Sequence, residues 1–372
     1  MPTPARYRRP VHGHAKSRRK QAGRVLTAVN ILLIQLKRIG DLILTTPAIS
    51  ALREKFPEAR LVLAASRDVA ALIPAIKEID QTFALRRNLG DLGAFASVAL
   101  QKFDYCIDFT RNDRSAFLSL LSKAQKRIVS YRVKRRAPWR GRAYNEFVNH
   151  RMRDMHTIDY NLSLLEPLGI QGVSPPVHLD LPETAREGAE KLLQHARIGT
   201  PFAIFHPGSA RVEKFWEPAR WSDVITHAIT RRGLNAVLTG GTSRLEQDHL
   251  AEIMAGLPRP VEHAPVGSVV DLSGKMDLLT LAALIARARL LVTVDSAPVH
   301  LGAASATPQV ALFGPTNPFH WRPRESAALI LQGDSGVPRH EFIPKQARIP
   351  MKLISTEAVI NAMETLLSTP TA

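Results

Sequence analysis

The sequence predicts an α/β protein built from two doubly wound domains, each with a parallel β-sheet. Short apolar runs bounded by turn residues recur along the chain, and segments with helical spacing lie between them. The apolar runs are continuous rather than alternating, which is typical of strands that are buried on both faces of a sheet. A stretch rich in Pro and Gly, residues 172–183, interrupts the pattern near the middle. Strand–helix alternation on both sides of such a boundary predicts two parallel-sheet domains.

The elements follow in order along the chain. The predicted strands are the apolar runs at 31–36, 60–66, 105–110, 202–209, 235–241, 289–296 and 309–316. The predicted helices occupy 41–55, 68–78, 91–102, 184–196, 217–232, 244–256, 278–288 and 298–305. We therefore expect an N-terminal domain over 25–177 and a C-terminal domain over 178–352, two Rossmann-like halves that flank a cleft. Residues 353–372 contain a last helix, which we expect to pack back on the N-terminal domain.

Basic residues are concentrated in two segments. The chain has 50 Lys and Arg against 33 Asp and Glu, a formal net charge of +17. Residues 1–24 carry eight basic residues and no acid, and residues 123–142 carry nine basic residues and no acid. Because these two segments account for the whole excess, the charge indicates two polyanion-facing elements on a nearly neutral body. We expect 1–24, which is poor in apolar residues, to be a disordered tail.

The composition argues against several classes of protein. The lone Cys106 leaves no internal disulfide pair and no cysteine-rich metal site, which fits a reducing cytoplasm. No apolar run reaches the roughly 18 residues of a membrane span, and the N-terminus lacks the apolar core of a secretory signal. The histidines form no metal-ligand spacing, and both the GxxxxGK[ST] phosphate loop and the GxGxxG fingerprint are absent. A P-loop NTPase, a metalloenzyme and an NAD-type dehydrogenase are therefore disfavoured.

Polar residues stand at the ends of four predicted strands, where ligands of open α/β sheets bind. The first such place is KRIGD, in which Gly40 permits a tight turn and Asp41 precedes a helix. Asp41 is either a helix N-cap or a carboxylate at the mouth of the cleft that accepts a proton from a nucleophile. Lys37 and Arg38 either bind an anion there or are simply solvated.

The second and third strand ends suit a nucleotide. In HPGSARVEK, Gly208 and Ser209 can offer an amide and a hydroxyl to a phosphate, and Lys214 can neutralise a diphosphate. A turn with a surface lysine is the alternative. In TGGTSRLEQ, Glu246 can accept hydrogen bonds from ribose hydroxyls, or it is an exposed residue at a helix start.

The fourth strand end is VDSAPVH. Ser296 or Asp295 can cap a helix whose first turn holds Pro298, so a well-capped helix with an incidental His300 is one interpretation. In the other, the helix amides and the Ser296 hydroxyl bind phosphate. Asp295 then accepts from a neutral sugar hydroxyl, since a carboxylate beside a diphosphate would be repelled.

In this order, the four pieces resemble glycosyltransferase family nine, the heptosyltransferases of lipopolysaccharide core assembly. The resemblance covers roughly residues 29–325 and is strongest in ILLIQLKRIGDLILTTPAISALREKFPEARL, HPGSARVEKFWEPARW and DLSGKMDLLTLAALIARARLLVTVDSAPVHLGAASATPQVALFGPTNPFHW. The segments DFTRNDRSAFLSLL and HTIDYNLSLLEPLGI look most like the heptosyltransferase III branch. The resemblance implies a GT-B fold, ADP-heptose as donor, a lipid A–core oligosaccharide as acceptor, and inversion without a metal or redox cofactor.

The resemblance also implies roles for single residues. Asp41 matches the proposed general base. The resemblance and the residues at the strand ends together predict a set that binds the donor: Gly208, Ser209, Lys214, Glu246, Met276, Asp295, Ser296, Ala297 and His300. Ala297 replaces the usual glycine of a D-[ST]-G-x-x-H element, so its methyl group is expected to crowd an amide contact to phosphate. Expected acceptor contacts are Lys37, Arg38, Arg111, Asn112 and Arg114.

The basic segment 123–142, with Tyr131 and Trp139, is expected to be a loop that grips acceptor phosphates and the anionic inner-membrane surface. A merely solvated charge run is the alternative. We expect a cytoplasmic enzyme, peripheral at the inner face of the inner membrane, without a nucleic-acid partner. Two other functions stay open: the same fold with another nucleotide sugar, a hexose or N-acetylhexosamine donor, and a basic nucleic-acid-binding protein, for which no recognised motif is present.

Overall fold

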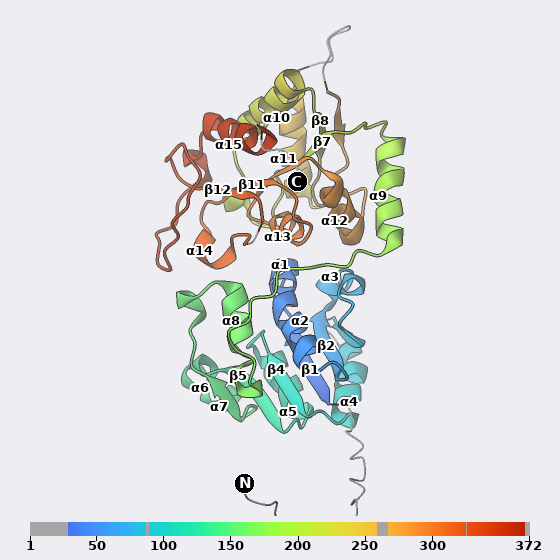
Figure 1. Cartoon of the computed structure of the whole chain (residues 1–372), viewed down its shortest axis with the longest axis vertical. Coiled ribbons are helices and arrows are strands. Elements are labelled where there is room, and N and C mark those ends of the chain that lie inside the picture. Colours follow the sequence, from blue (N-terminus) through green and yellow to red (C-terminus); the bar gives the residue numbers. More distant parts are fainter. Residues whose placement is uncertain (1–28, 87–88, 259–266, 325, 369–372) are drawn as a thin grey trace, which may run out of the picture.

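Two parallel six-stranded sheets organise the chain (Figure 1). The computed structural model describes residues 29–86, 89–258, 267–324 and 326–368, so the expected disordered tail 1–24 lies outside the described residues. The strand order is β3-β2-β1-β4-β5-β6 in the first sheet and β12-β11-β10-β7-β8-β9 in the second. The order reverses beside β1 and beside β7, as it does in a doubly wound fold. The predicted fold class of two doubly wound domains is therefore confirmed.

The strands of the first sheet are β1 (Asn30–Gln35), β2 (Arg60–Ser66), β3 (Gln81–Leu85), β4 (Tyr105–Asp108), β5 (Lys126–Ser130) and β6 (Glu146–Val148). Those of the second sheet are β7 (Phe202–His206), β8 (Asn235–Leu238), β9 (Val269–Asp271), β10 (Leu290–Val294), β11 (Gln309–Leu312) and β12 (Ala328–Leu331). All the pairings are parallel; Ile31, for example, lies opposite Leu61 of β2 and Tyr105 of β4.

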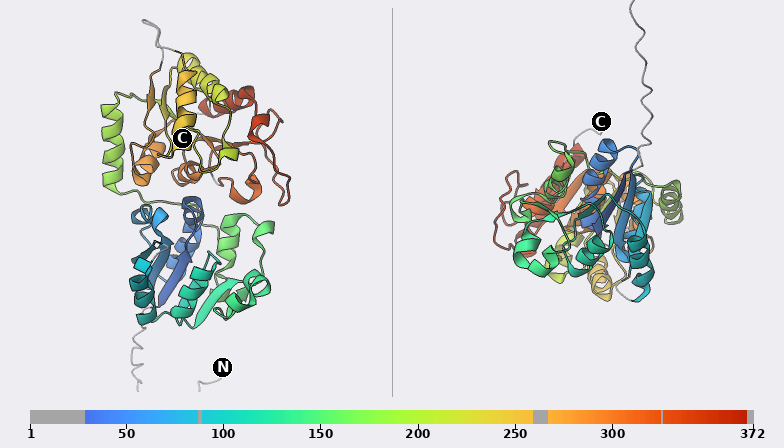
Figure 2. Two further views of the ribbon diagram at one scale, coloured as in Figure 1. Left: turned by 180° about the vertical axis from the view of Figure 1, so that it is seen from behind. Right: turned by 90° about the horizontal axis from the view of Figure 1, so that it is seen from below.

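The helices around the first sheet are α1 (Ile39–Ile43), α2 (Thr46–Lys55), α3 (Arg67–Ala70), α4 (Leu92–Leu100), α5 (Asp113–Leu121), α6 (Arg132–Arg136), α7 (Pro138–Gly141) and α8 (Thr157–Ser163). Around the second sheet they are α9 (Glu183–His195), α10 (Pro218–Arg232), α11 (Arg244–Ala255), α12 (Leu278–Arg287), α13 (Ala297–Ala304), α14 (Pro318–Trp321) and α15 (Thr356–Ser368). The two domains are stacked end to end, with α1 and α13 at their junction (Figures 1 and 2).

Strand β1 shows how the sequence builds both faces of the first sheet. Its central residues are fully buried and alternate between two cores. Ile31 and Leu33 pack in the core that contains α2 and α8, whereas Leu32 and Ile34 pack with residues of α4 and α5. A continuous apolar run is needed because both faces are covered by helices.

The structure adds strands that the sequence analysis did not predict, namely β3, β5, β6, β9 and β12. Four of them are sheet edges, and the fifth, β5, begins with Lys126 and Arg127, so none of them stands out as a continuous apolar run. The prediction that 123–142 forms a loop is wrong, because it contains β5, α6 and α7. The predicted helix 41–55 is interrupted between α1 and α2, and Pro47 stands in the first turn of α2.

Helix α15 belongs to the second domain, so the expectation that it packs back on the N-terminal domain is wrong. Val359, Ala362 and Met363 share a core with the fully buried Trp216 and Trp221 of the second domain. This apolar face is spaced by three and four residues, as a helix side that covers a core requires. The helix is therefore held by α10 and by the strands β10, β11 and β12.

Candidate active site

The first turn of α1 touches α13 of the other domain at a glycine. A Cβ atom placed on Gly40 would lie 2.6 Å from Cδ2 and 2.9 Å from Nε2 of His300. Side chains do not tolerate such distances, so the bare glycine lets the two helices meet. The tight turn expected at Gly40 is not what the structure shows, because the residue lies inside α1. Close approach between domains is the reason for a glycine here.

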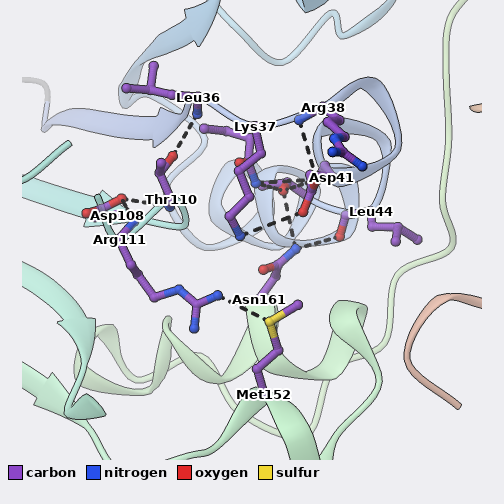
Figure 3. A network of polar contacts seen from close by, with 12 residues as sticks. Leu36, Lys37, Arg38, Asp41, Leu44, Asp108, Thr110, Arg111, Met152 and Asn161 are labelled. Atoms are coloured by element: carbon purple, nitrogen blue, oxygen red, sulfur yellow. Dashed lines mark hydrogen bonds and ion pairs between the residues drawn. The ribbon is translucent and has the colours of Figure 1, made fainter. Parts of the chain in front are cut away.

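Asp41 lies on α1 next to this contact (Figure 3). Arg38 is the N-cap residue of α1, so Asp41 is not the cap itself but the acidic residue of the first turn. Its Oδ2 accepts a hydrogen bond from the Arg38 amide at 3.4 Å, and its Oδ1 is 3.6 Å from Nζ of Lys37. The carboxylate side chain is 12% exposed. It therefore supports the helix start and still reaches the junction.

Lys37 is held between acidic groups rather than solvated. Burial lowers the pKa of Lys37, while the nearby Asp41 and Asp108 oppose this shift and Arg111 adds to it. Asp108 ends β4 and is fully buried. It accepts hydrogen bonds from the Arg111 amide at 3.0 Å and from the Tyr144 hydroxyl at 2.5 Å. Asp108 and Tyr144 were not among the residues predicted for the site, although the rule on strand ends applies to Asp108.

The other expected acceptor residues divide into two kinds. Arg38 is exposed, and Arg111 has its guanidinium 4.8 Å from the ring centroid of Tyr160. Asn112, by contrast, caps α5 and accepts a hydrogen bond from its third residue at 2.9 Å. Arg114 donates to the buried carboxylate of Asp91 at 2.5 Å. The polar groups of these last two residues therefore serve the local structure.

On the second domain, Lys214 and Asp295 form a buried ion pair. The Lys214 ammonium donates to the Asp295 carboxylate at 2.6 Å and to its backbone carbonyl at 2.8 Å. The two side chains are 12% and 7% exposed. Asp295 therefore faces a cation and not the neutral sugar hydroxyl expected from the sequence. Pairing allows both charges to remain at the junction despite their burial.

The amides at the start of α13 have no side-chain cap. Ser296 is the N-cap residue, yet its side chain makes no capping hydrogen bond, and its hydroxyl donates instead to the Val294 carbonyl at 3.3 Å. The interpretation as a well-capped helix is therefore wrong for this side chain. Ala297 is the first residue of the helix. Uncapped amides and the helix dipole make this terminus suitable for an anion.

His300 brings the two halves of the site together. It is 5% exposed, and its Nδ1 has no hydrogen-bond partner among the described residues. Burial lowers its pKa and Lys214 acts in the same direction, while Asp295 and Asp41 oppose the shift. The ring is therefore neutral at pH 7, with four ionisable side chains from two domains converging on one spot.

Glu246 lies in the first turn of α11 and is half-buried. Cβ atoms placed on Gly208 and Gly241 would both collide with its carboxylate, and Ser243 donates to it at 2.9 Å. Its carboxylate is thus fixed against two glycine backbones rather than freely exposed. Ser209, which follows Gly208 in the sequence, is buried. Its hydroxyl accepts a hydrogen bond from the Arg211 amide at 3.3 Å. Met276 is half-buried and packs against the core.

A second set of contacts joins the domains beside the site. His156 bonds to the Arg322 carbonyl at 2.9 Å, and His320 bonds to the Met155 carbonyl at 2.9 Å. The Arg324 guanidinium is 2.7 Å from the Asp159 carboxylate. Burial lowers the pKa of His156 to about 3, so its bond is made by a neutral ring. We call these three contacts the interdomain bridge; no sequence motif indicated it.

Known proteins share this arrangement of domains and motifs. The family model Glycosyltransferase family 9 (heptosyltransferase) matches residues 94–341. The chain belongs to this family. It is therefore a glycosyltransferase, as the family resemblance implied. Two Escherichia coli proteins named lipopolysaccharide heptosyltransferase 3 are 29% and 27% identical to it, covering 76% and 88% of this chain and 83% and 95% of their own lengths.

Solved structures confirm the GT-B architecture. A glycosyl transferase family 9 protein from Veillonella parvula superposes with a TM-score of 0.77 at 24% identity, covering 91% of this chain and 97% of its own. The E. coli ADP-heptose lps heptosyltransferase II gives 0.73 at 19% identity, covering 91% and 98%. A more distant neighbour, with a TM-score of 0.54, is described as an iron-containing heptosyltransferase. Within the part of this chain that the structure describes, no group of three His, Cys, Asp or Glu side chains is placed to hold a metal ion.

Proposed function

We propose that this chain transfers heptose from ADP-heptose to the lipid A–core acceptor of lipopolysaccharide, with inversion at the anomeric carbon. The observation that carries the proposal is the junction of α1 and α13, where Asp41 of one domain and the Lys214–Asp295 pair of the other lie around the ring of His300. The family and the names of its relatives supply the substrate class. A metal or redox cofactor has no part in the proposed reaction.

Asp41 is the general base. Inversion requires that the acceptor hydroxyl attacks the face of the sugar opposite to ADP, so base and leaving group must come from opposite sides. Asp41 reaches the junction from the first domain, and its carboxylate contacts the ammonium of Lys37 and the Arg38 amide. The acceptor hydroxyl would give its proton to this carboxylate as the new bond forms.

The second domain stabilises the departing ADP. Negative charge grows on the diphosphate as the glycosidic bond breaks, and preorganised donors lower the barrier most where that charge appears. The uncapped amides of α13, the Ser296 hydroxyl and Lys214 are the donors we assign. Gly208 and Ser209 extend this phosphate site, and the fixed Glu246 carboxylate accepts from the ribose hydroxyls.

Several residues complete the donor and acceptor sites. The neutral ring of His300 and the carboxylate of Asp295 contact the sugar, and Met276 lies near the adenine. Lys37, Arg38 and Arg111 form the acceptor side, whereas Asn112 and Arg114 are left out of the proposal because their polar groups are already engaged. The enzyme works in the cytoplasm at the inner face of the inner membrane. None of the described helices is long and apolar enough to cross a bilayer.

Ala297 supports one alternative, the same reaction with another nucleotide sugar. Its methyl group stands at the first residue of the helix whose amides we assign to the diphosphate. A binding panel of ADP-heptose against UDP- and GDP-sugars decides between the donors. Tightest binding of ADP-heptose supports the proposal, and tightest binding of a UDP- or GDP-sugar replaces it with the alternative.

The base is tested by Asp41→Asn. Asparagine keeps the size of the side chain and can still accept from the Arg38 amide, so the variant is expected to fold. Transfer should fall by about 10²-fold or more, because the amide cannot take a proton. The rate is measured as ADP release in the presence of acceptor, with Asp113→Asn, on an exposed carboxylate of the same domain, as the matched control. Normal transfer by Asp41→Asn would remove the base assignment.

A further inference from the structure

The first domain carries an apolar surface that no described segment of the chain covers. Helix α4 has no charged residue, and Val98 is its one fully buried side chain. Leu92 and Leu100 are 64% and 86% exposed. On the neighbouring helix α5, Phe117 and Leu120 are 48% and 52% exposed. Exposed apolar side chains that gather on adjacent helices mark an interaction site, whereas single ones do not.

These side chains stand on helices that contact one another. Phe95 of α4 and Phe117 of α5 meet edge to face, with ring centroids 5.5 Å apart. Helix α5 lies between α4 and α7 (Figure 1). On α7, Trp139 is 60% exposed, and Arg140 of the same helix forms an ion pair with Asp113 of α5. We call the exposed side chains of α4, α5 and α7 the apolar surface.

Unpaired cations border the apolar surface. Lys102 follows α4 and Lys123 follows α5, and both are exposed. Arg135, Arg136 and Arg142 are exposed beside Trp139. None of these five side chains forms an ion pair with another described residue, as the ion pairs of the first domain involve other cations. The nearby acids Asp91 and Asp113, by contrast, are paired.

The described chain begins near the end of α4. Strand β1 begins at Asn30, whose backbone amide and carbonyl bond to Asp104, four residues after the end of α4. The first strand of the described chain therefore starts close to Lys102. Apolar side chains, a tryptophan and a surplus of cations on one side fit an anionic bilayer, where apolar groups enter the headgroup region and cations bind the lipid phosphates.

We propose that the apolar surface docks the enzyme on an anionic lipid bilayer, with Leu92, Leu100, Phe117, Leu120 and Trp139 in the headgroup region. The inference deepens the proposed function, on which it rests for the lipid-anchored acceptor, by naming the surface that faces the membrane. Electrostatic attraction brings the chain to the bilayer, and the apolar side chains hold it there. A solvated charge run alone would bind without entering the lipid.

Tryptophan fluorescence of the full chain tests this docking. Trp216 and Trp221 are fully buried and Trp321 is half-buried, so Trp139 reports best on the surroundings of the surface. Vesicles of phosphatidylcholine and phosphatidylglycerol should shift the emission to the blue, and brominated lipids should quench it. Both signals should be lost in Trp139→Phe. A chain that binds these vesicles without shift or quenching is held by charge alone, which overturns the proposal.

A double variant, Leu100→Ser with Leu120→Ser, tests the apolar part. Both side chains are exposed, so the fold should be unaffected, and binding in vesicle flotation should fall by about tenfold or more. Val337→Ser, which changes a 62% exposed side chain of the second domain, should bind like the wild type. Unchanged binding of the double variant overturns the proposal. The proposal is also overturned if the wild type is a dimer and the double variant is a monomer, because a second copy of the chain would then cover the surface.

A soluble acceptor separates this inference from the proposed function. With a core oligosaccharide that lacks its lipid, wild type and double variant should transfer heptose equally well. If neither transfers heptose while both vesicle results hold, the proposed function fails and the docking surface stands. If the double variant alone loses this transfer, the surface serves the catalytic site, and the docking proposal is overturned.

Discussion

Replacing Gly40 by alanine tests whether the contact of α1 with α13 sets the catalytic geometry. The added Cβ would stand 2.6 Å from the His300 ring, whereas ordinary contacts begin at 3.4 Å. The helices must therefore separate by about 0.8 Å, and Asp41 moves with α1 away from the donor site. Misplacement of about 1 Å costs on the order of 10²-fold in rate, so kcat should fall by roughly that factor. The KM for ADP-heptose should change less than kcat, because the groups assigned to the diphosphate, the α13 amides and Lys214, are not touched by the added Cβ.

The assay follows ADP release at saturating donor and acceptor. Gly199→Ala is the matched control, since its Cβ would meet only the Asn235 side chain, at 3.8 Å. Circular dichroism should show both variants folded. If kcat of Gly40→Ala stays within about twofold of the wild type, the reasoning is refuted. Transfer would then tolerate the displacement of α1 from α13 that should misplace Asp41.

Three other perturbations have expected outcomes. Lys214→Met leaves the buried Asp295 carboxylate unpaired, so the free energy of unfolding in urea titrations should fall by about 3–5 kcal/mol. ADP binding, measured by calorimetry, should weaken. Lys214→Arg should retain much of the stability and of the ADP binding. Arg324→Ala removes the ion pair of the interdomain bridge and should lower the apparent melting temperature while leaving the secondary structure intact; an unchanged melting temperature would show that the bridge adds no stability. Burial lowers the pKa of His206 to about 4 from its usual 6.5, so the unfolded chain binds a proton that the folded chain does not. Stability should therefore fall as the pH drops from 6.5 towards 4, and His206→Gln should reduce this slope by about 1.4 kcal/mol per pH unit, which a variant with an unchanged slope would contradict.

The sequence predicted the central strands well and the edges poorly. Central strands such as β1 and β10 are buried on both faces, so they need long apolar runs that stand out in a sequence. Edge strands such as β9 have three half-buried residues and leave almost no pattern. The fate of α15 was unpredictable for another reason: its apolar face fits any core of the right shape, and only the tertiary structure shows that Trp216 and Trp221 provide it.

The candidate site divides in the same way. Asp41, Lys214 and His300 follow strands, and the rule that ligands bind beyond strand ends predicts all three beside the cleft. A single segment of the sequence does not show which other strand end its residues will contact. The pairing of Lys214 with Asp295, the collision that would follow a side chain at residue 40, and the buried Asp108 behind Lys37 arise from contacts between segments far apart in the sequence.

The interdomain bridge has a consequence for the way the molecule can move. The covalent connection between the domains runs past α3, where the Asp180 amide donates to the Ala75 carbonyl at 2.8 Å, and the bridge lies on the other side of α1, next to α8 (Figure 1). A body tied at two separated points keeps one easy rotation, about the line through both ties. Product release would then widen the gap between the domains on one side of that line, and the reaction cycle would leave both ties in place.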